Sequence, residues 1–102
     1  MPAYVISDLQ VRDATLVQEY RPIAAASIAQ YGGRYLTRFG DIDPVEGGWA
    51  PASIVIVEFP SMARAREWWN SPEYAPGRAI AERALTRRVI FVDGVITPPP
   101  GP

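Results

Sequence analysis

One apolar run, residues 53–59, constrains the fold of this chain more than any other segment. Four β-branched residues follow one another from Ile54 to Val57, which is typical of a strand covered on both faces. Pro60 cannot continue such a strand, and Ser61 is suited to cap a following helix. Glu58 stands at the end of the run, so the fold must either pair this carboxylate or use it. We therefore expect a buried strand that leads directly into a helix and carries one candidate functional acid.

Length and charge limit the class of protein. A chain of 102 residues with 48% hydrophobic residues forms one modest core, so residues 1–95 are predicted to be a single domain and residues 96–102 a flexible, proline-rich tail. The net charge of −1 leaves no electrostatic footprint for nucleic acid or an acidic membrane. No apolar run approaches the roughly 20 residues that span a bilayer. We expect a soluble, cytoplasmic protein.

The chain has no cysteine and no histidine. Disulfides, thiolate nucleophiles and Ser-His-Asp catalysis are therefore excluded. The commonest metal ligand and the ordinary proximal haem ligand are missing as well. The acids of the loop 41–51 match no calcium-binding spacing. We expect neither a cofactor nor a metal.

The first half of the chain predicts a strand, a helix and a second strand. Residues 3–9 alternate and are rich in β-formers, which predicts the first strand. Asp13 is suited to cap a helix that continues to about residue 31, with a kink or break at Pro22 and an end at the glycine pair 32–33. Residues 34–39 predict the second strand, and residues 41–51 a hairpin connection to the third.

The second half of the chain again predicts a strand, a helical region and a strand, beginning with the strand at residues 53–59. A helix is predicted over residues 61–69, and Ser71-Pro72-Glu73 signals that a second helical segment starts and runs to about residue 85. Residues 88–92 predict the last strand. The order βαββαβ is that of a ferredoxin-like α+β sandwich, with an antiparallel sheet of strand order 4-1-3-2. Within it we expect the first and third strands to be central and parallel to each other.

Four segments resemble the motifs of the DUF1330 family: YGGRYL at 31–36, VEFPS at 57–61, WWNSPEY at 68–74 and VDGV at 92–95. The resemblance covers roughly residues 3–95. It implies a dimeric α/β barrel, a homodimer in which two ferredoxin-like protomers pack sheet against sheet. The chain departs from the pattern at residues 75–77, where Pro76 and Gly77 interrupt a helix that continues smoothly in related chains.

Strand pairing predicts a polar group at one edge of the sheet. With the first and third strands parallel, Asp8 and Glu58 would lie at the same edge, with Arg34 beside Glu58 and Arg88 beside Asp8. Residue parity puts these four side chains and Arg38 on the face that meets the partner sheet. Glu58 and Arg34 are then either a structural ion pair that fixes register, or a carboxylate of raised pKa acting as acid or base beside an anion-binding arginine.

Aromatic residues predict the wall of a pocket. Trp68 and Trp69 cannot both point inward, because neighbours on a helix are about 100° apart, so one is expected in the core and the other at a pocket or dimer contact. Tyr74, and Tyr20 near Pro22, are further candidates for substrate binding, with Asn70 offering an amide.

Two classes of function fit these expectations. The first is a small cofactor-independent enzyme that acts on a small, partly apolar, carbonyl-bearing metabolite by acid/base chemistry as an isomerase, cyclase or dehydratase, or as a cofactor-free monooxygenase. In it Glu58 is the acid or base, Arg34 and Arg38 assist, and Asp8, Tyr20, Trp69, Asn70 and Tyr74 bind substrate. The second is a non-catalytic dimeric module that binds a small molecule.

Overall fold

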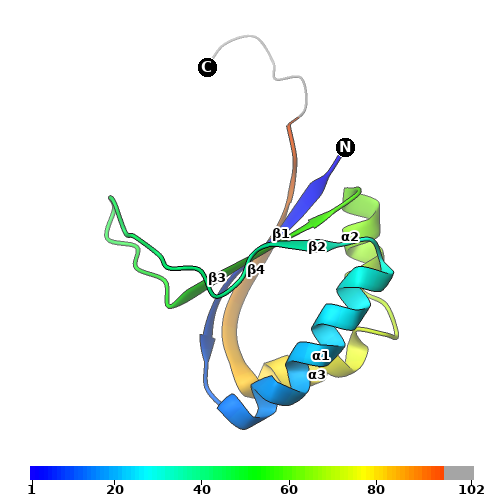
Figure 1. Ribbon diagram of the computed structural model, residues 1–102, viewed down its shortest axis with the longest axis horizontal. Coiled ribbons are helices and arrows are strands. Elements are labelled where there is room, and N and C mark those ends of the chain that lie inside the picture. Colours follow the sequence, from blue (N-terminus) through cyan, green and yellow to red (C-terminus); the bar gives the residue numbers. More distant parts are fainter. Residues whose placement is uncertain (96–102) are drawn as a thin grey trace.

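A computed structural model describes residues 1–95 of the chain; the predicted flexible tail, 96–102, lies outside the described residues. Four strands, β1 (Ala3–Val11), β2 (Arg34–Thr37), β3 (Ser53–Phe59) and β4 (Leu85–Asp93), form one sheet of order β2-β3-β1-β4. Helices α1 (Ala14–Gln30), α2 (Met62–Trp69) and α3 (Ala75–Ala84) cover one face of this sheet (Figure 1). The predicted ferredoxin-like α+β architecture and its strand order are confirmed.

Each strand pairs with its neighbours in antiparallel fashion, including β1 with β3. The expectation that β1 and β3 are parallel is therefore wrong. The helix α1 carries the chain back so that β2 runs parallel to β1, and β3 inserts between them in the opposite direction. Asp8 pairs with Ile54 and Glu58 pairs with Tyr4, so the two acids lie at opposite ends of β3 instead of side by side.

The helix caps follow the sequence closely. The Asp13 carboxylate accepts a hydrogen bond from the Leu16 N–H at 3.1 Å, and the Ser61 hydroxyl accepts one from the Arg64 N–H at 3.1 Å. Gly32, with φ +81°, ends α1, as glycine does without the strain that a Cβ adds. Pro22 lies inside α1 without breaking it, so the predicted break is wrong. Proline removes one intrahelical hydrogen bond, which packing of α1 against α3 and the sheet offsets.

The sheet has two unlike faces. The inner face, which the helices cover, carries Val5, Val57 and Phe91 in register, and the first two belong to the main core with Phe59 and Trp68. The outer face carries three isoleucines in register across the sheet: Ile6, Ile56 and Ile90. The outer face is uncovered in the protomer, and 56% of Ile90 is exposed. The protomer therefore has one buried sheet face and one apolar face open to a further contact.

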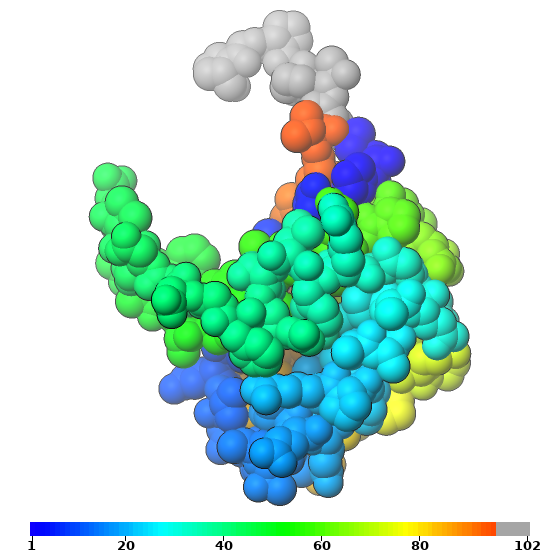
Figure 2. All heavy atoms as spheres, viewed as in Figure 1, coloured from blue at the N-terminus to red at the C-terminus, as the bar shows by residue number. Residues whose placement is uncertain are grey.

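A long arm, residues 40–52, joins β2 to β3 and projects away from the sheet and helices (Figure 2). It is the predicted hairpin connection, since β2 and β3 pair antiparallel. Val45 and Trp49 on the arm are 87% and 57% exposed. The Trp49 indole N–H returns to the outer face and donates to the Asp8 carboxylate at 3.3 Å.

Candidate functional site

The Glu58–Arg34 pair lies on the outer face of the sheet. Arg34 Nε donates to Glu58 Oε1 at 2.8 Å, as the cross-strand pairing predicts. This bond is the main reason that the pKa of Glu58 is lowered, with a further hydrogen bond from Tyr4 acting in the same direction against desolvation. Of the two alternatives for this pair, the lowered pKa favours the structural ion pair over a carboxylate of raised pKa. An ionised, paired carboxylate favours one pairing register between neighbouring strands, and it is a weak base at neutral pH.

The second outer-face pair is Asp8 with Arg88. Arg88 Nη2 and Asp8 Oδ2 are 2.6 Å apart, so the predicted cross-strand contact is confirmed. Because β1 and β3 are antiparallel, this pair lies at the other end of the outer face from Glu58. The two pairs therefore bracket the isoleucine stripe and do not form one polar site.

A cavity of about 170 Å³ lies on the other side of the sheet, between α1 and the inner face. Its wall is largely apolar, with contributions from Val5, Ala24, Ile28 and Val57. Five aromatic residues, Tyr20, Tyr35, Phe39, Trp68 and Trp69, add flat surfaces to it. Among the described residues that line it, none is an aspartate or a glutamate. A wall of this kind accommodates a flat, partly apolar small molecule.

Three hydrogen-bonding side chains form a buried cluster at this cavity. The Tyr20 and Tyr74 hydroxyls are 2.7 Å apart, and Arg87 Nη1 donates to both, at 3.3 and 3.1 Å respectively. Tyr20 and Arg87 line the cavity, whereas Tyr74 is fully buried behind them. Burial, and then the proximity of Tyr74, raise the pKa of Tyr20 despite the opposing effect of Arg87. Tyr20 is therefore a protonated hydrogen-bond donor at neutral pH.

A count of protons shows what the cluster can offer a ligand. One hydroxyl proton joins the two tyrosine oxygens, and Arg87 donates to each oxygen from the other side. When Tyr74 donates to Tyr20, the Tyr20 proton has no partner within this cluster and is available to a ligand. The guanidinium keeps further N–H groups, since it has five in all. The cluster is thus a set of donors suited to a carbonyl, enolate or phenolate oxygen.

Trp68 and Trp69 divide as predicted. Trp68 is 3% exposed, stacks on Tyr74 with ring centroids 4.1 Å apart, and donates from Nε1 to the Ser27 hydroxyl at 3.0 Å. Trp69 is half-buried, lies edge-on to Phe91 and contributes its ring to the cavity wall. One tryptophan therefore anchors the core, although it also borders the cavity, and the other lines the cavity.

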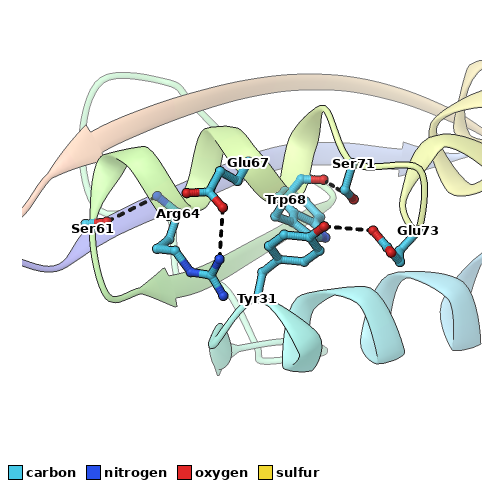
Figure 3. Close-up of polar contacts among 7 residues, drawn as sticks. All are labelled: Tyr31, Ser61, Arg64, Glu67, Trp68, Ser71 and Glu73. Atoms are coloured by element: carbon cyan, nitrogen blue, oxygen red, sulfur yellow. Dashed lines mark hydrogen bonds and ion pairs between the residues drawn. The ribbon is translucent and has the colours of Figure 1, made fainter.

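Polar contacts around α2 and the turn after it fix the surroundings of Trp68 (Figure 3). The Tyr31 hydroxyl, just after α1, donates to Glu73 Oε1 at 2.7 Å, which ties the end of α1 to the turn between α2 and α3. In that turn Ser71 Oγ donates to the Trp68 carbonyl at 2.7 Å and accepts from the Tyr74 N–H at 3.1 Å. The predicted restart at Ser71 is thus a capped turn, and α3 itself begins only at Ala75, with Pro76 in its first turn.

The predicted site residues fall into two groups. Tyr20, Trp69 and Arg38 line the cavity, and Tyr74 supports it. Arg34, Glu58 and Asp8 are on the outer face, and the Asn70 amide caps α2 by donating to the Arg66 carbonyl. Arg38 was expected on the outer face. An irregularity in pairing between Tyr35 and Thr37 shifts the parity of β2, so that Arg38 reaches the cavity instead.

The sequence analysis missed Arg87, Arg21 and Phe39. Arg87 escaped notice because the last strand was expected to begin at residue 88, whereas β4 begins at Leu85. The signal was present: Arg87, Val89 and Phe91 alternate, which puts all three on one face of a longer strand. Phe39 and Arg21 offered no such pattern. The position of Phe39 depends on the irregularity in β2, and Arg21 joins the cavity through a long-range contact with Phe39.

The described residues show neither a metal-binding cluster nor a membrane-spanning helix. Within residues 1–95 no group of three or more acids forms a potential metal site. No helix in the same range is long and apolar enough to cross a bilayer.

The chain belongs to the family described as Domain of unknown function (DUF1330), which it matches over residues 2–95. A search of curated proteins finds no match. A solved protein of unknown function from Rhodopseudomonas palustris is similar, with a TM-score of 0.72 and 17% identity over 93% of this chain and 83% of that one. The identification of the sequence as DUF1330 is therefore confirmed.

Two other solved structures share the fold. A dimeric protein of unknown function with a ferredoxin-like fold from Bacteroides fragilis has a TM-score of 0.63 and 14% identity, covering 91% of this chain and 96% of that one. SnoaB, a cofactor-independent oxygenase from Streptomyces nogalater, has a TM-score of 0.59 and 12% identity, covering 96% and 97%. At these identities the likeness establishes the fold alone.

The lowered pKa of Glu58 gives a pH prediction. A carboxylate whose folded pKa lies below its ordinary value, 4.5, stabilises the folded state above that value and loses this contribution as the pH falls through the folded pKa. The stability difference between the wild type and Glu58→Gln should therefore be largest near neutral pH and shrink in acid, as measured by urea unfolding at several pH values. Glu19→Gln, exposed on α1, controls for the loss of one negative charge. A difference that grows in acid would mean a raised Glu58 pKa.

Proposed function

We propose that the protein is a small cofactor-independent enzyme that binds a flat, partly apolar, carbonyl-bearing metabolite in the cavity between α1 and the sheet. The proposal rests on one observation above the others. Tyr20 and Arg87 bring hydrogen-bond donors to a largely apolar cavity whose described lining contains no carboxylate. Such donors stabilise negative charge that develops on oxygen, and they are strongest where water is scarce.

The chemistry that this arrangement supports is formation of an enolate. A proton leaves the carbon next to the substrate carbonyl for water or a buffer base, and the electron pair of that C–H bond moves to the carbonyl oxygen. Tyr20 and Arg87 donate hydrogen bonds to that oxygen as its charge grows. Return of the proton at another carbon completes an isomerisation, and loss of a leaving group from the enolate completes a dehydration.

Glu58 has a different role in this proposal from the one that the sequence suggested. Its carboxylate is ionised, bonded to Arg34 and on the outer face, whereas the cavity is on the inner face. We assign it to register and to the contact between protomers. The catalytic residues of the proposal are Tyr20 and Arg87, and Trp69 shapes the cavity.

A carbon acid tests this proposal without knowledge of the natural substrate. α-Tetralone, a flat bicyclic ketone, should exchange its α-hydrogens for deuterium faster with the wild-type protein in D₂O than in buffer alone, as followed by proton NMR. Removal of one donor to a developing oxyanion typically costs about 100-fold or more in rate. We expect Arg87→Gln to lose most of the acceleration and Tyr20→Phe a large part of it.

Glu58→Gln and Arg66→Gln are the matched variants in the exchange experiment. Arg66 is exposed on α2 and does not line the cavity, so its change controls for the loss of one guanidinium. Both variants should keep the acceleration. Loss of exchange in Glu58→Gln, with retention in Arg87→Gln, would contradict the proposal and return the base role to Glu58. Binding without acceleration would support a non-catalytic binding module. Oxygen uptake, recorded in parallel, tests the oxygenase variant that the likeness to SnoaB raises.

We also propose that the outer face pairs with the same face of a second copy. The isoleucine stripe is apolar and open, and each end carries one acid and one arginine, so the face is complementary to itself under a two-fold axis. The exposed Val45 and Trp49 of the arm extend the apolar surface beyond the sheet. The protein from Bacteroides fragilis, which shares the fold, is dimeric, and this supports a dimer without indicating which faces pair.

A charge in the isoleucine stripe tests the homodimer. Ile90→Lys should convert a dimer to a monomer in light scattering coupled to size exclusion, because two buried ammonium groups would face each other across the axis. Ala79→Lys, on the exposed surface of α3, adds the same charge on the helical side and should leave the mass unchanged. A wild-type monomer, or a dimer that survives Ile90→Lys and not Ala79→Lys, would contradict this pairing.

A further inference from the structure

The cavity carries more positive charge than the proposed enolate chemistry needs, since that chemistry uses only Arg87. Three arginines line it, namely Arg21 from α1, Arg38 after β2 and Arg87 from β4. The whole chain has ten basic and eleven acidic residues, yet within residues 1–95 no acid lines this cavity. A cationic cavity in a slightly acidic protein indicates a ligand with negative charge.

Three arginines outside the cavity are neutralised by acids. Arg34, Arg64 and Arg88 form ion pairs with Glu58, Glu67 and Asp8 respectively. Arg21 and Arg38 take part in none of the ion pairs found among the described residues. Each lies against an aromatic ring, and stacking uses the flat face of a guanidinium, so that N–H groups on its edge can still bind a ligand.

Phe39 brings these two arginines together at the mouth of the cavity. The guanidinium carbons of Arg21 and Arg38 lie 4.8 and 5.3 Å from the centre of its ring. Arg38 also lies 4.0 Å from the Tyr35 ring centre, so its orientation is fixed from two sides. Both arginines are exposed, unlike Arg87, which is half-buried beside Tyr20. The cavity therefore has an exposed polar group at its mouth, Arg21 and Arg38, and a half-buried polar group, Arg87 with Tyr20.

The backbone at the mouth is strained. Phe39 has φ +66°, a left-handed conformation, and it is the one residue other than glycine within the described part of the chain to have a positive φ. A bulky residue adopts this conformation only at a cost in free energy, and such strain concentrates at sites of function. Its ring is also 66% exposed, so burial of the side chain does not account for the strain.

We infer that the substrate of this cavity is a carboxylate: a flat, apolar carbonyl compound whose anionic group is held at the mouth by Arg21 and Arg38 stacked on Phe39. The inference rests on the proposed function, and it adds the anionic group and its location. A guanidinium presents two parallel N–H groups that match a carboxylate, and two such forks bind it from different directions. With the carboxylate at the mouth, the carbonyl at the far end of the same molecule reaches Tyr20 and Arg87.

The test compares two ligands of equal shape. 2-Naphthoate and 2-naphthamide differ in the charge of one group, and binding of either is followed through the fluorescence of Trp68 and Trp69, which line the cavity. Because hydrogen bonds to charged groups are stronger than neutral ones, the wild type should bind the carboxylate at least about tenfold more tightly than the amide. Added salt should weaken this preference.

Variants locate the charge that is responsible. Arg21→Gln and Arg38→Gln should each reduce the preference for the carboxylate several-fold, and the double variant should abolish it, while affinity for the amide stays the same in all of them. Arg66→Gln, which changes an exposed arginine outside the cavity, should retain the preference.

Three results would overturn the inference. They are equal affinity of the wild type for both ligands, an undiminished preference in the double variant, and a preference that Arg87→Gln removes and the double variant does not. None of these three results bears on the exchange reaction of α-tetralone, because that ketone is neutral. Failure of both naphthalene ligands to bind would instead count against the cavity as a site, and so against the proposed function as well.

Discussion

The stacking of Trp68 on Tyr74 is the contact on which the site depends. The two rings are 4.1 Å apart, both side chains are buried, and they come from either side of the turn between α2 and α3. The Ser27 hydroxyl fixes the indole from α1, and the capped turn at Ser71 fixes the backbone between the rings. Tyr74 can then present its hydroxyl to Tyr20 and Arg87 in one position only. Packing of this density transmits the geometry of the core to the half-buried polar group of the cavity.

The sheet separates two kinds of arginine chemistry. On the outer face, arginines are paired with acids across neighbouring strands, which neutralises both and favours one register. On the inner side, arginines meet hydroxyls and aromatic rings, which satisfy part of each guanidinium without cancelling its charge. The same residue type thus stabilises the fold on one face and prepares a binding site on the other. Because strand side chains alternate, consecutive residues Arg87 and Arg88 belong to the two different systems.

Much of the fold could be predicted from the sequence, because local signals agree with the tertiary structure. The β-branched run at residues 54–57, the caps at Asp13 and Ser61 and the glycines after α1 each produce the expected element. Cross-strand pairs between Arg34 and Glu58 and between Asp8 and Arg88 were also predictable, since each needs only the order of two neighbouring strands. The relative direction of β1 and β3 was mistaken, and with it the joint site of Asp8 and Glu58.

The site was less predictable, because it depends on small departures from regular structure. One irregularity in β2 moves Arg38 from the outer face to the cavity, and an early start of β4 brings Arg87 into the sheet. Neither has a signature in the composition of a short strand. Trp69 was recognisable as a wall residue, since it and its neighbour Trp68 cannot both point into the core from one helix. What joins the cavity wall to the chemistry is the half-buried guanidinium of Arg87.

The central claim is that a ligand binds at the inner-face cavity and not at the Glu58 edge of the outer face. The three tryptophan indoles report on this directly, because Trp68 and Trp69 line the cavity whereas the Trp49 indole contacts Asp8 on the outer face. In ¹⁵N-labelled protein the three indole N–H resonances can be followed as α-tetralone is added. The Trp69 resonance, with that of Trp68, should shift and that of Trp49 should stay in place. A shift of Trp49 without a shift of Trp69 would contradict the account.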